Sequence, residues 1–369
     1  MKNKLSNLLI LICFIHISTI KAQLTPIDKS ATSSTKIFYQ NLHKQAEKGF
    51  MMGHQDDLAY GIGWKNIEGE SDIKRVTGQY PAVFGWELAH IELDSANNLD
   101  GVSFEKMKQN IKKVHAMGGV NTITWHLRNP VNGKSAWDVD TVVKHILKGG
   151  NKHAVYQSWM AKVAVFLSSL KDEKGNQIPV IFRPFHEHNG SWFWWGKKFC
   201  TPEEYKKLYQ QTVQYLGSKG VHNVIYAYST DNFPDETDYL ERYPGNDFVD
   251  LIGFDTYHRN APQSNDTFVK NLQRMLSTVE NYAEKNHKLF AITETGLEKV
   301  TEPNWWTNIL LKGIDNHKIS YVLLWRNGRP DHYYVPYPNQ QSAEDFKEFV
   351  KNPKVFLGDK IKLENLYKK

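Results

Sequence analysis

Residues 179–189 read PVIFRPFHEHN, an apolar run that passes directly into a cluster of charged and hydrogen-bonding side chains. The run is short and does not alternate with polar residues, which is typical of a strand buried on both faces of a parallel sheet. Seven other stretches repeat this pattern. The eight candidate strands are Met51–His54, Ala82–Leu88, Val120–His126, Pro179–His186, Val224–Ser229, Val249–Tyr257, Leu289–Thr293 and Tyr321–Trp325.

The segments between these runs have the spacing of helices, with apolar residues three and four positions apart. The clearest are Phe104–Met117, Tyr156–Leu170, Glu203–Lys219 and Phe268–Lys285. Eight strand-then-helix units in about 300 residues predict an α/β fold of the (β/α)8 TIM barrel type. A doubly wound open sheet is the alternative, but its Gly-rich phosphate loop is missing, because Gly61-Ile62-Gly63 has no third glycine.

The start of the chain resembles a secretory signal peptide over residues 1–22. Lys2 and Lys4 precede an apolar run, Leu8–Ile17, about half as long as the ~20 residues that span a bilayer. We therefore expect residues 23–369 to form one exported domain without membrane insertion, in the periplasm or alternatively outside the cell. Neither an internal repeat nor a Pro/Gly/Ser linker divides this part.

The charge and the cysteine content exclude a class of binding partner and a class of covalent cross-link. The formal net charge of +6 includes three lysines of the predicted leader, and so modest a balance predicts no nucleic-acid partner. Of the two cysteines, Cys13 lies in the leader and Cys200 outside it, which excludes an intrachain disulfide in the mature chain. We expect a monomer stabilised by its core.

The polar clusters that end the runs predict a common site, because the carboxyl ends of barrel strands converge on one face. Glu187 and Glu294 each follow an apolar run and are surrounded by hydrogen-bonding residues, among them Arg183 and Thr293. Hydrolysis of a glycosidic bond needs two carboxyl groups, one to protonate the leaving oxygen and one to attack or to activate water. The pair is the best candidate for this chemistry.

Other chemistries fit the residues less well. His126, His186 and His188 are metal-ligand types near Glu187, but His-Glu-His is not the i, i+4 helical pair of a zinc protease. A Ser/His/Asp hydrolase would show a Gly-x-Ser-x-Gly elbow, which the sequence lacks. We therefore interpret the histidines as hydrogen-bond partners of Glu187 and of sugar hydroxyls, and expect neither a metal nor an organic cofactor.

Aromatic residues supply the third ingredient of a sugar site. Ser191–Gly196 contains four consecutive aromatic residues directly after Glu187, which would be costly to expose without a ligand. Burial of these rings as a loop plug is the alternative. Trp325 and Arg326 end the eighth run, where they could form a wall and a clamp for hydroxyl groups.

The motif Arg183-Pro184-Phe185-His186-Glu187, followed by Asn189-Gly190 and Trp192, resembles that of glycoside hydrolase family 26. This family consists chiefly of β-mannanases and lies within a clan of retaining barrel glycosidases, many of which have Asn where His186 stands. The resemblance implies that Glu187 is the acid/base and Glu294 the nucleophile. It further implies a −1 subsite and its support made of His126, Arg183, His186, Trp192, Asp255, Tyr257, Trp325 and Arg326, with Tyr257 hydrogen-bonded to the nucleophile.

The expected function is that of a retaining β-mannanase acting on mannan, galactomannan or manno-oligosaccharides. The alternatives are a β-xylanase or mixed-linkage β-glucanase of the same family, and a non-catalytic glycan-binding barrel. The polar segment His90–Ser103 after the second run is long for a barrel loop, and such loops are often functional. If it closes the distal end of the cleft, the enzyme would act from chain ends and release mannobiose.

Overall fold

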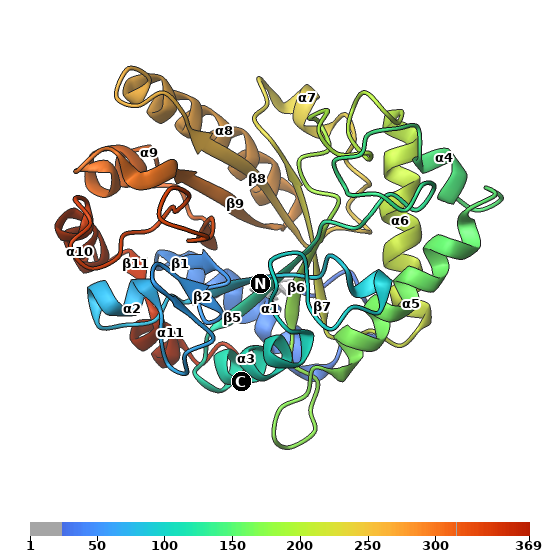
Figure 1. The fold of residues 1–369 in the computed structure, drawn as a ribbon, viewed down its shortest axis with the longest axis horizontal. Helices are drawn as coiled ribbons and strands as arrows, with labels where there is room; N and C mark the ends of the chain where they lie inside the picture. The colour runs from blue at the N-terminus through green and yellow to red at the C-terminus, as the bar shows by residue number, and fades with distance from the viewer. Residues whose placement is uncertain (1–23, 315) are drawn as a thin grey trace, which may run out of the picture.

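The computed structural model describes residues 24–314 and 316–369, so the predicted signal peptide lies outside the described residues. Eight parallel strands form a closed barrel with helices around it, as predicted (Figure 1). The strands are β1 (Phe50–Gln55), β4 (Val83–Glu87), β5 (Val120–Trp125), β6 (Val180–Pro184), β7 (Val224–Thr230), β8 (Leu251–His258), β9 (Leu289–Leu297) and β10 (Tyr321–Leu324).

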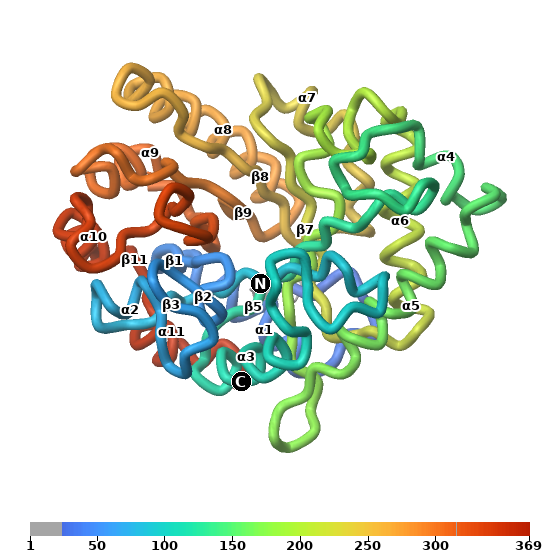
Figure 2. The backbone as a smooth tube through the Cα atoms, in the orientation of Figure 1, coloured from blue at the N-terminus to red at the C-terminus, as the bar shows by residue number. Residues whose placement is uncertain are grey.

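The strands follow one another around the barrel in sequence order. Pairing of β10 with β1, in which Met51 lies beside Tyr321, closes the ring. Figure 2 shows the consequence, since the colours run around the molecule until the red C-terminal segments lie beside the blue N-terminal ones. A short strand, β11 (Val355–Phe356), pairs with β1, and β2 (Tyr60–Gly61) and β3 (Trp64–Lys65) form a small hairpin.

Each barrel strand sends alternate residues to two separate cores, as the pleat requires. Phe50, Met52 and their counterparts face outward and pack in the large cluster shared with the helices. Met51, Ile181 and their counterparts fill the lower part of the barrel. The upper ends of the same strands are lined by polar residues, so the chain leaves the C-terminal end of the barrel free for a site.

Helices cover the outside of the barrel, and α1 (Ser33–Ala46) closes its N-terminal end. The others are α2 (Asp72–Thr77), α3 (Phe104–Ala116), α4 (Val143–Ile146), α5 (His153–Ser169), α6 (Pro202–Ser218), α7 (Glu236–Leu240), α8 (Asn265–Asn286), α9 (Lys312–Ile314), α10 (Ala343–Lys351) and α11 (Gly358–Glu364). The four predicted helices correspond to α3, α5, α6 and α8, with ends shifted by a few residues. Among the described residues, no helix has the length and apolar character needed to cross a membrane.

Helix α6 illustrates how local sequence sets an element boundary. Thr201 caps the helix and Glu204 bonds back to the Thr201 backbone, which satisfies two amide groups that a helix start leaves free. Pro202 occupies the first helical position, where its missing N–H costs nothing. This fixed start ends the loop that begins at Phe185 and carries Glu187, so the loop has a defined length between β6 and α6.

Candidate active site

Arg183 lies at the centre of the polar end of the barrel. It projects from β6 into the interior, is fully buried, and donates to Asp255 Oδ2 at 2.8 Å and to Ser229 Oγ at 2.9 Å. Its other terminal nitrogen donates to the carboxylate of Glu294. One guanidinium therefore pairs with two buried carboxylates. Buried charges need such a partner, because the protein interior solvates them poorly.

Glu294 reaches this position through an irregularity in β9. The residues Leu289 and Ala291 face the barrel interior, so strict alternation would turn Glu294 outward with Phe290 and Ile292. The register against β8 shifts between Phe254 and Asp255, which gives β9 one extra residue there. This bulge turns Glu294 into the barrel, where its Oε2 also accepts a hydrogen bond of 2.8 Å from the Tyr257 hydroxyl.

Glu187 is placed by a turn rather than by a strand. Strand β6 ends at Pro184, and Phe185 and Glu187 have φ values of 53° and 52°, in the left-handed region that costs energy for residues other than glycine. The Glu187 amide donates to the carbonyl of Ser229 at 3.1 Å. Its side chain accepts a hydrogen bond of 2.6 Å from the Trp192 indole and is half-buried.

The two glutamates have different electrostatic surroundings. Burial, followed by the charges of Asp255 and Glu294, raises the pKa of Glu187 well above its usual range. Glu187 has a neutral indole as its hydrogen-bond donor, whereas Glu294 is paired with the Arg183 cation. This arrangement favours a proton on Glu187 and a negative charge on Glu294, which is the division of roles that an acid and a nucleophile need.

A chain of histidines borders this pair. His126 lies 2.6 Å from Glu87 Oε2 through Nδ1 and 3.0 Å from His186 Nε2 through its own Nε2. Burial opposes a charge on His126, but the Glu87 carboxylate outweighs it and raises the pKa of His126. Burial and then the Arg183 charge lower the pKa of His186 well below its usual range. The Nδ1–H of His126 donates to Glu87, and the Nε2 atoms of His126 and His186 share one proton across their 3.0 Å contact.

The metal alternative can be compared with this geometry. Ligand atoms of His186, Asp255 and Glu294 lie within 4.8 Å of one another and are buried. Arg183 already bonds both carboxylates of that group, so a cation there would have to compete with a guanidinium for the same oxygen atoms. His188 points elsewhere, packing between the rings of Tyr205 and Tyr228, because the turn after β6 separates it from His186.

The aromatic loop divides into a ligand-accessible part and a buried part. The Trp192 side chain is 40% exposed, beside the Glu187 carboxylate to which it donates. Phe193, Trp194 and Trp195 are buried, and the Trp195 indole donates to the His186 carbonyl at 2.8 Å. Three of the four rings therefore support the loop from below, as in the loop-plug alternative, and Trp192 alone among them faces the cleft.

Trp325 and Arg326 follow β10 at the edge of the cleft. Trp325 lines a cavity of about 430 Å³ together with Tyr257, Arg259, Glu298, Tyr334 and residues next to them in sequence. Arg326 forms an ion pair of 2.9 Å with Asp100, from the long segment after β4. Of the eight residues assigned to the −1 subsite and its support, seven lie within the carboxyl ends of β6 and β8 or within two residues after β5, β6 and β10, and Trp192 lies further along the loop after β6.

Sequence reasoning did not assign two residues that contact this group. Glu87, the last residue of β4, accepts the Nδ1–H of His126. Trp137, which is 46% exposed, stacks on His126 with ring centroids 5.4 Å apart and planes at 15°. Trp137 lies in the long loop between β5 and α4, where no apolar run marks it. A lone Trp in a polar loop was the available signal.

Comparison with known proteins gives a consistent result. The family model described as glycosyl hydrolase family 26 matches residues 27–296. A family 26 β-mannanase from Bacteroides ovatus is 45% identical, with a TM-score of 0.88 over 92% of this chain and 98% of that one. A family 26 protein from Muricauda sp. is 35% identical, with a TM-score of 0.85 over 93% and 96% of the two chains.

Among curated proteins, a mannan endo-1,4-β-mannosidase from Bifidobacterium adolescentis is 30% identical over 356 residues, which cover 90% of this chain. This chain spans only 35% of the length of that relative, and 54% of the mannan endo-1,4-β-mannosidase from Bacillus subtilis strain 168. The family model covers well over half of the present chain and includes Glu187 and Glu294. The chain belongs to glycosyl hydrolase family 26.

Proposed function

We propose that this chain hydrolyses β-1,4-mannosidic bonds with Glu187 as acid/base and Glu294 as nucleophile. The observation that carries the proposal is the asymmetry between the two carboxyl groups. Arg183 and Tyr257 hold Glu294 as an anion, whereas burial and nearby negative charge favour the protonated form of Glu187. The mannan-directed names of the relatives from Bacteroides ovatus and Bifidobacterium adolescentis support the substrate.

The reaction takes two steps. Glu294 attacks the anomeric carbon as the bond to the leaving oxygen breaks, and Glu187 gives that oxygen its proton. The product of this step is a mannosyl ester of Glu294. Glu187, now a carboxylate, takes a proton from water, and the water oxygen displaces Glu294 from the anomeric carbon. Two displacements restore the β configuration, and Glu187 regains its proton.

The supporting residues follow from their contacts. Arg183 and Tyr257 orient one oxygen each of Glu294, which keeps the attacking carboxylate in a single position. Trp192 orients Glu187 through its indole N–H. His126, anchored by Glu87, stacks under the exposed ring of Trp137, against which a sugar ring could bind.

The decisive test is the stereochemistry of the first product. Proton NMR of a reaction with manno-oligosaccharide should show the β-anomer first, with the α-anomer appearing only by mutarotation. Early α-anomer would exclude Glu294 as a nucleophile. Parallel assays on mannan, xylan and mixed-linkage β-glucan test the substrate, and a protein that binds one of these without releasing reducing sugar would be a binding barrel instead.

We also propose that the enzyme acts from chain ends. The segment after β4 carries Asp100 to Arg326, so the loops of β4 and β10 are joined at one edge of the cleft. Tyr60 donates to Asp56 at 2.7 Å nearby, and burial, with the Asp100 charge, raises the pKa of Asp56 to about 8. A joined edge would leave room for few sugar units beyond the reacting one, which favours release of mannobiose.

Cleavage mode can be measured by comparing viscosity with reducing sugar. Chain-end action predicts a slow fall in mannan viscosity and early mannobiose. Asp100→Ala, which removes the contact with Arg326, should increase the loss of viscosity per bond cleaved, while Asp94→Ala in the same segment serves as the control. A rapid early loss of viscosity in the native enzyme would establish internal cleavage.

Export and oligomeric state belong to the same proposal. The apolar leader supports export to the periplasm, where short manno-oligosaccharides would be the substrate. We further propose that the mature protein is a monomer. Cell fractionation with N-terminal sequencing tests the first statement, and light scattering of the purified protein tests the second. Recovery from the cytoplasm with Met1 retained would contradict export.

A further inference from the structure

The turn that carries Glu187 is tied to the loop that follows the neighbouring strand β7. Asn189 makes this connection, since its side-chain oxygen accepts the Asp231 amide at 2.7 Å. The Asn189 amide group donates to the carbonyls of Asp231 at 3.3 Å and Asn232 at 2.9 Å. The backbone of Asp231 is therefore fixed in position relative to Glu187, two residues away from Asn189 along the chain.

The Asp231 carboxylate differs from the other acids around Glu187. It is half-buried and accepts a hydrogen bond of 3.0 Å from the neutral Asn232 amide. In the part of the chain that the structure describes, it takes part in none of the ion pairs, whereas Asp255 and Glu294 share Arg183. Burial raises the pKa of the Asp231 carboxyl, and the hydrogen bonds from Asn232 and the charge of Arg259, which lies over the Tyr257 ring at 5.9 Å, oppose this effect.

We propose that Asp231 is a positioning residue whose negative charge keeps the proton on Glu187 until a glycosidic oxygen is in place. The inference rests on the proposed acid/base role of Glu187. In the first step Glu187 loses its proton to the leaving oxygen, and in the second it recovers one from water. A fixed like charge disfavours the anionic form between these steps, and so favours the recovery.

Four ionisable groups from three neighbouring elements act electrostatically on Glu187. Asp255 and Tyr257 come from β8, Glu294 from β9 and Asp231 from the loop after β7. Burial has the largest effect on the pKa of Glu187, and Asp255, Glu294 and Asp231 follow as like charges that also raise it. Asp255 and Glu294 belong to the Arg183 cluster and cannot be neutralised without disturbing the nucleophile. Asp231 can be.

The test is the pH profile of kcat/KM for Asp231→Asn, with native protein as reference. The basic limb, where Glu187 loses its proton, should move to lower pH by about 0.5 to 1 unit, while the acidic limb stays in place. Asp231→Glu keeps the charge and should keep the native profile. Asp266→Asn, at an exposed acid in the first turn of α8, removes the same charge from a residue outside the group of acids that raises the pKa of Glu187, and is the matched control.

A second readout does not depend on turnover. Carboxyl ¹³C NMR of the folded protein, with the Glu187 signal assigned by its loss in Glu187→Gln, should show a lower midpoint in Asp231→Asn and in Asp231→Ser. A raised KM with an unchanged basic limb and an unchanged midpoint would overturn the proposal, and would make Asp231 a sugar contact or a loop anchor.

The failure of the proposed function would look different. In that case Glu187→Gln would keep its activity on mannan and its basic limb, whatever the Asp231 variants do. If Glu187→Gln abolishes activity on mannan and the Asp231 variants leave both readouts unchanged, the acid/base role stands and the inference about Asp231 is wrong. Melting temperatures of all variants identify any that lose activity through unfolding.

Discussion

The two ends of the barrel are built on opposite principles. At the N-terminal end, α1 lies under the strands, and its Phe38, Tyr39 and Leu42 are buried against the apolar residues of the barrel interior. At the C-terminal end, the same strands present carboxylates, an arginine and histidines. One end is closed by hydrophobic burial, and the other holds polar groups that need one another to remain buried. Stability and chemistry are therefore assigned to separate ends.

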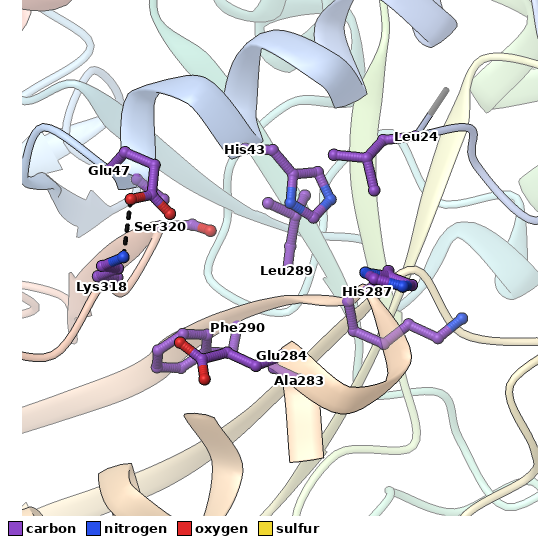
Figure 3. Close-up of a pocket in the computed structure, with 12 residues that line it drawn as sticks. Leu24, His43, Glu47, Ala283, Glu284, His287, Leu289, Phe290, Lys318 and Ser320 are labelled. Carbon is purple, nitrogen blue, oxygen red and sulfur yellow. Dashed lines mark ion pairs between the residues drawn. The ribbon is translucent and has the colours of Figure 1, made fainter. Parts of the chain in front are cut away.

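The way charges are placed shows the same contrast. A pocket of about 170 Å³ lies beside α1 at the N-terminal end, lined by His43, Glu47, His287 and Lys318 among others (Figure 3). There Glu47 is paired with Lys318 at 2.8 Å, so opposite charges meet. At the other end three acids lie together near Glu187. Clustering of like charges costs stability, and it is retained where a perturbed pKa serves a reaction.

Removal of the nucleophile should cause the largest loss of activity at the C-terminal end of the barrel. Glu294→Ala leaves no group to form the mannosyl ester, so kcat/KM on mannan should fall by about 10⁴-fold or more. Mass spectrometry after treatment with a 2-fluoro mannoside should find the label on Glu294 in native protein. Glu344→Ala, at an exposed acid in the first turn of α10, is the control, and labelling at Glu298 would contradict the assignment.

Removal of the acid should have a smaller and substrate-dependent effect. Glu187→Ala should lose about 10²–10⁴-fold on mannan, since proton transfer contributes about that much. An activated aryl mannoside does not need protonation, so its first step should remain near the native rate, and a burst of aryl alcohol should show it. Equal losses on both substrates would mean that Glu187 does not act as the acid.

A substitution at the N-terminal end, where α1 closes the barrel, should lower the free energy of unfolding and leave kcat unchanged. Phe38→Ala removes a fully buried ring from the lower core, and we expect a loss of about 3–5 kcal/mol in the free energy of unfolding. Denaturant titration measures this loss. The kcat of the folded fraction should stay native, because the change lies at the end opposite Arg183. A loss of kcat without a loss of stability would mean that the ends are coupled.

The pocket beside α1 offers the mildest test. Burial, followed by the His287 charge, lowers the pKa of His43 to about 4. A folded pKa below the unfolded one means that stability is present above the unfolded value and is lost as pH falls through the window from about 6.5 towards 4. The free energy of unfolding of His43→Leu should therefore exceed that of native protein at pH 5 by about 2 kcal/mol, and the two should differ less at pH 8. A larger difference at pH 8 would contradict this.

Much of the architecture could be predicted because strands buried on both faces leave continuous apolar runs. All eight runs correspond to barrel strands, and Glu187 and Glu294 follow the fourth and seventh. The sequence did not show what turns the side chains of these two glutamates toward the inside of the barrel. The β9 bulge at Thr293 and the left-handed φ of Glu187 result from tertiary contacts, with Arg183 and Ser229, that no local pattern encodes.

Contacts between distant loops were equally hidden. The pairing of Asp100 with Arg326 joins residues that lie far apart in sequence, and its partners look like ordinary surface charges one at a time. The aromatic loop was ambiguous for another reason, because composition does not distinguish a sugar platform from a plug. Burial decided against Trp194 and Trp195 and left Trp192 exposed.

Helix α1, which closes the N-terminal end of the barrel, also determines where the molecule can be attached to a support. Asn41 of α1 donates to the carbonyls of Leu366 and Lys368, and Phe38 stacks on Tyr367 at 5.0 Å, so the last residues of the chain dock on the first helix, beneath the barrel. A tag or tether attached after Lys369 would leave from the end opposite Glu187. Enzyme immobilised on a bead through that tether would present its cleft to the solution, and dissolved polysaccharide could reach it without passing the support.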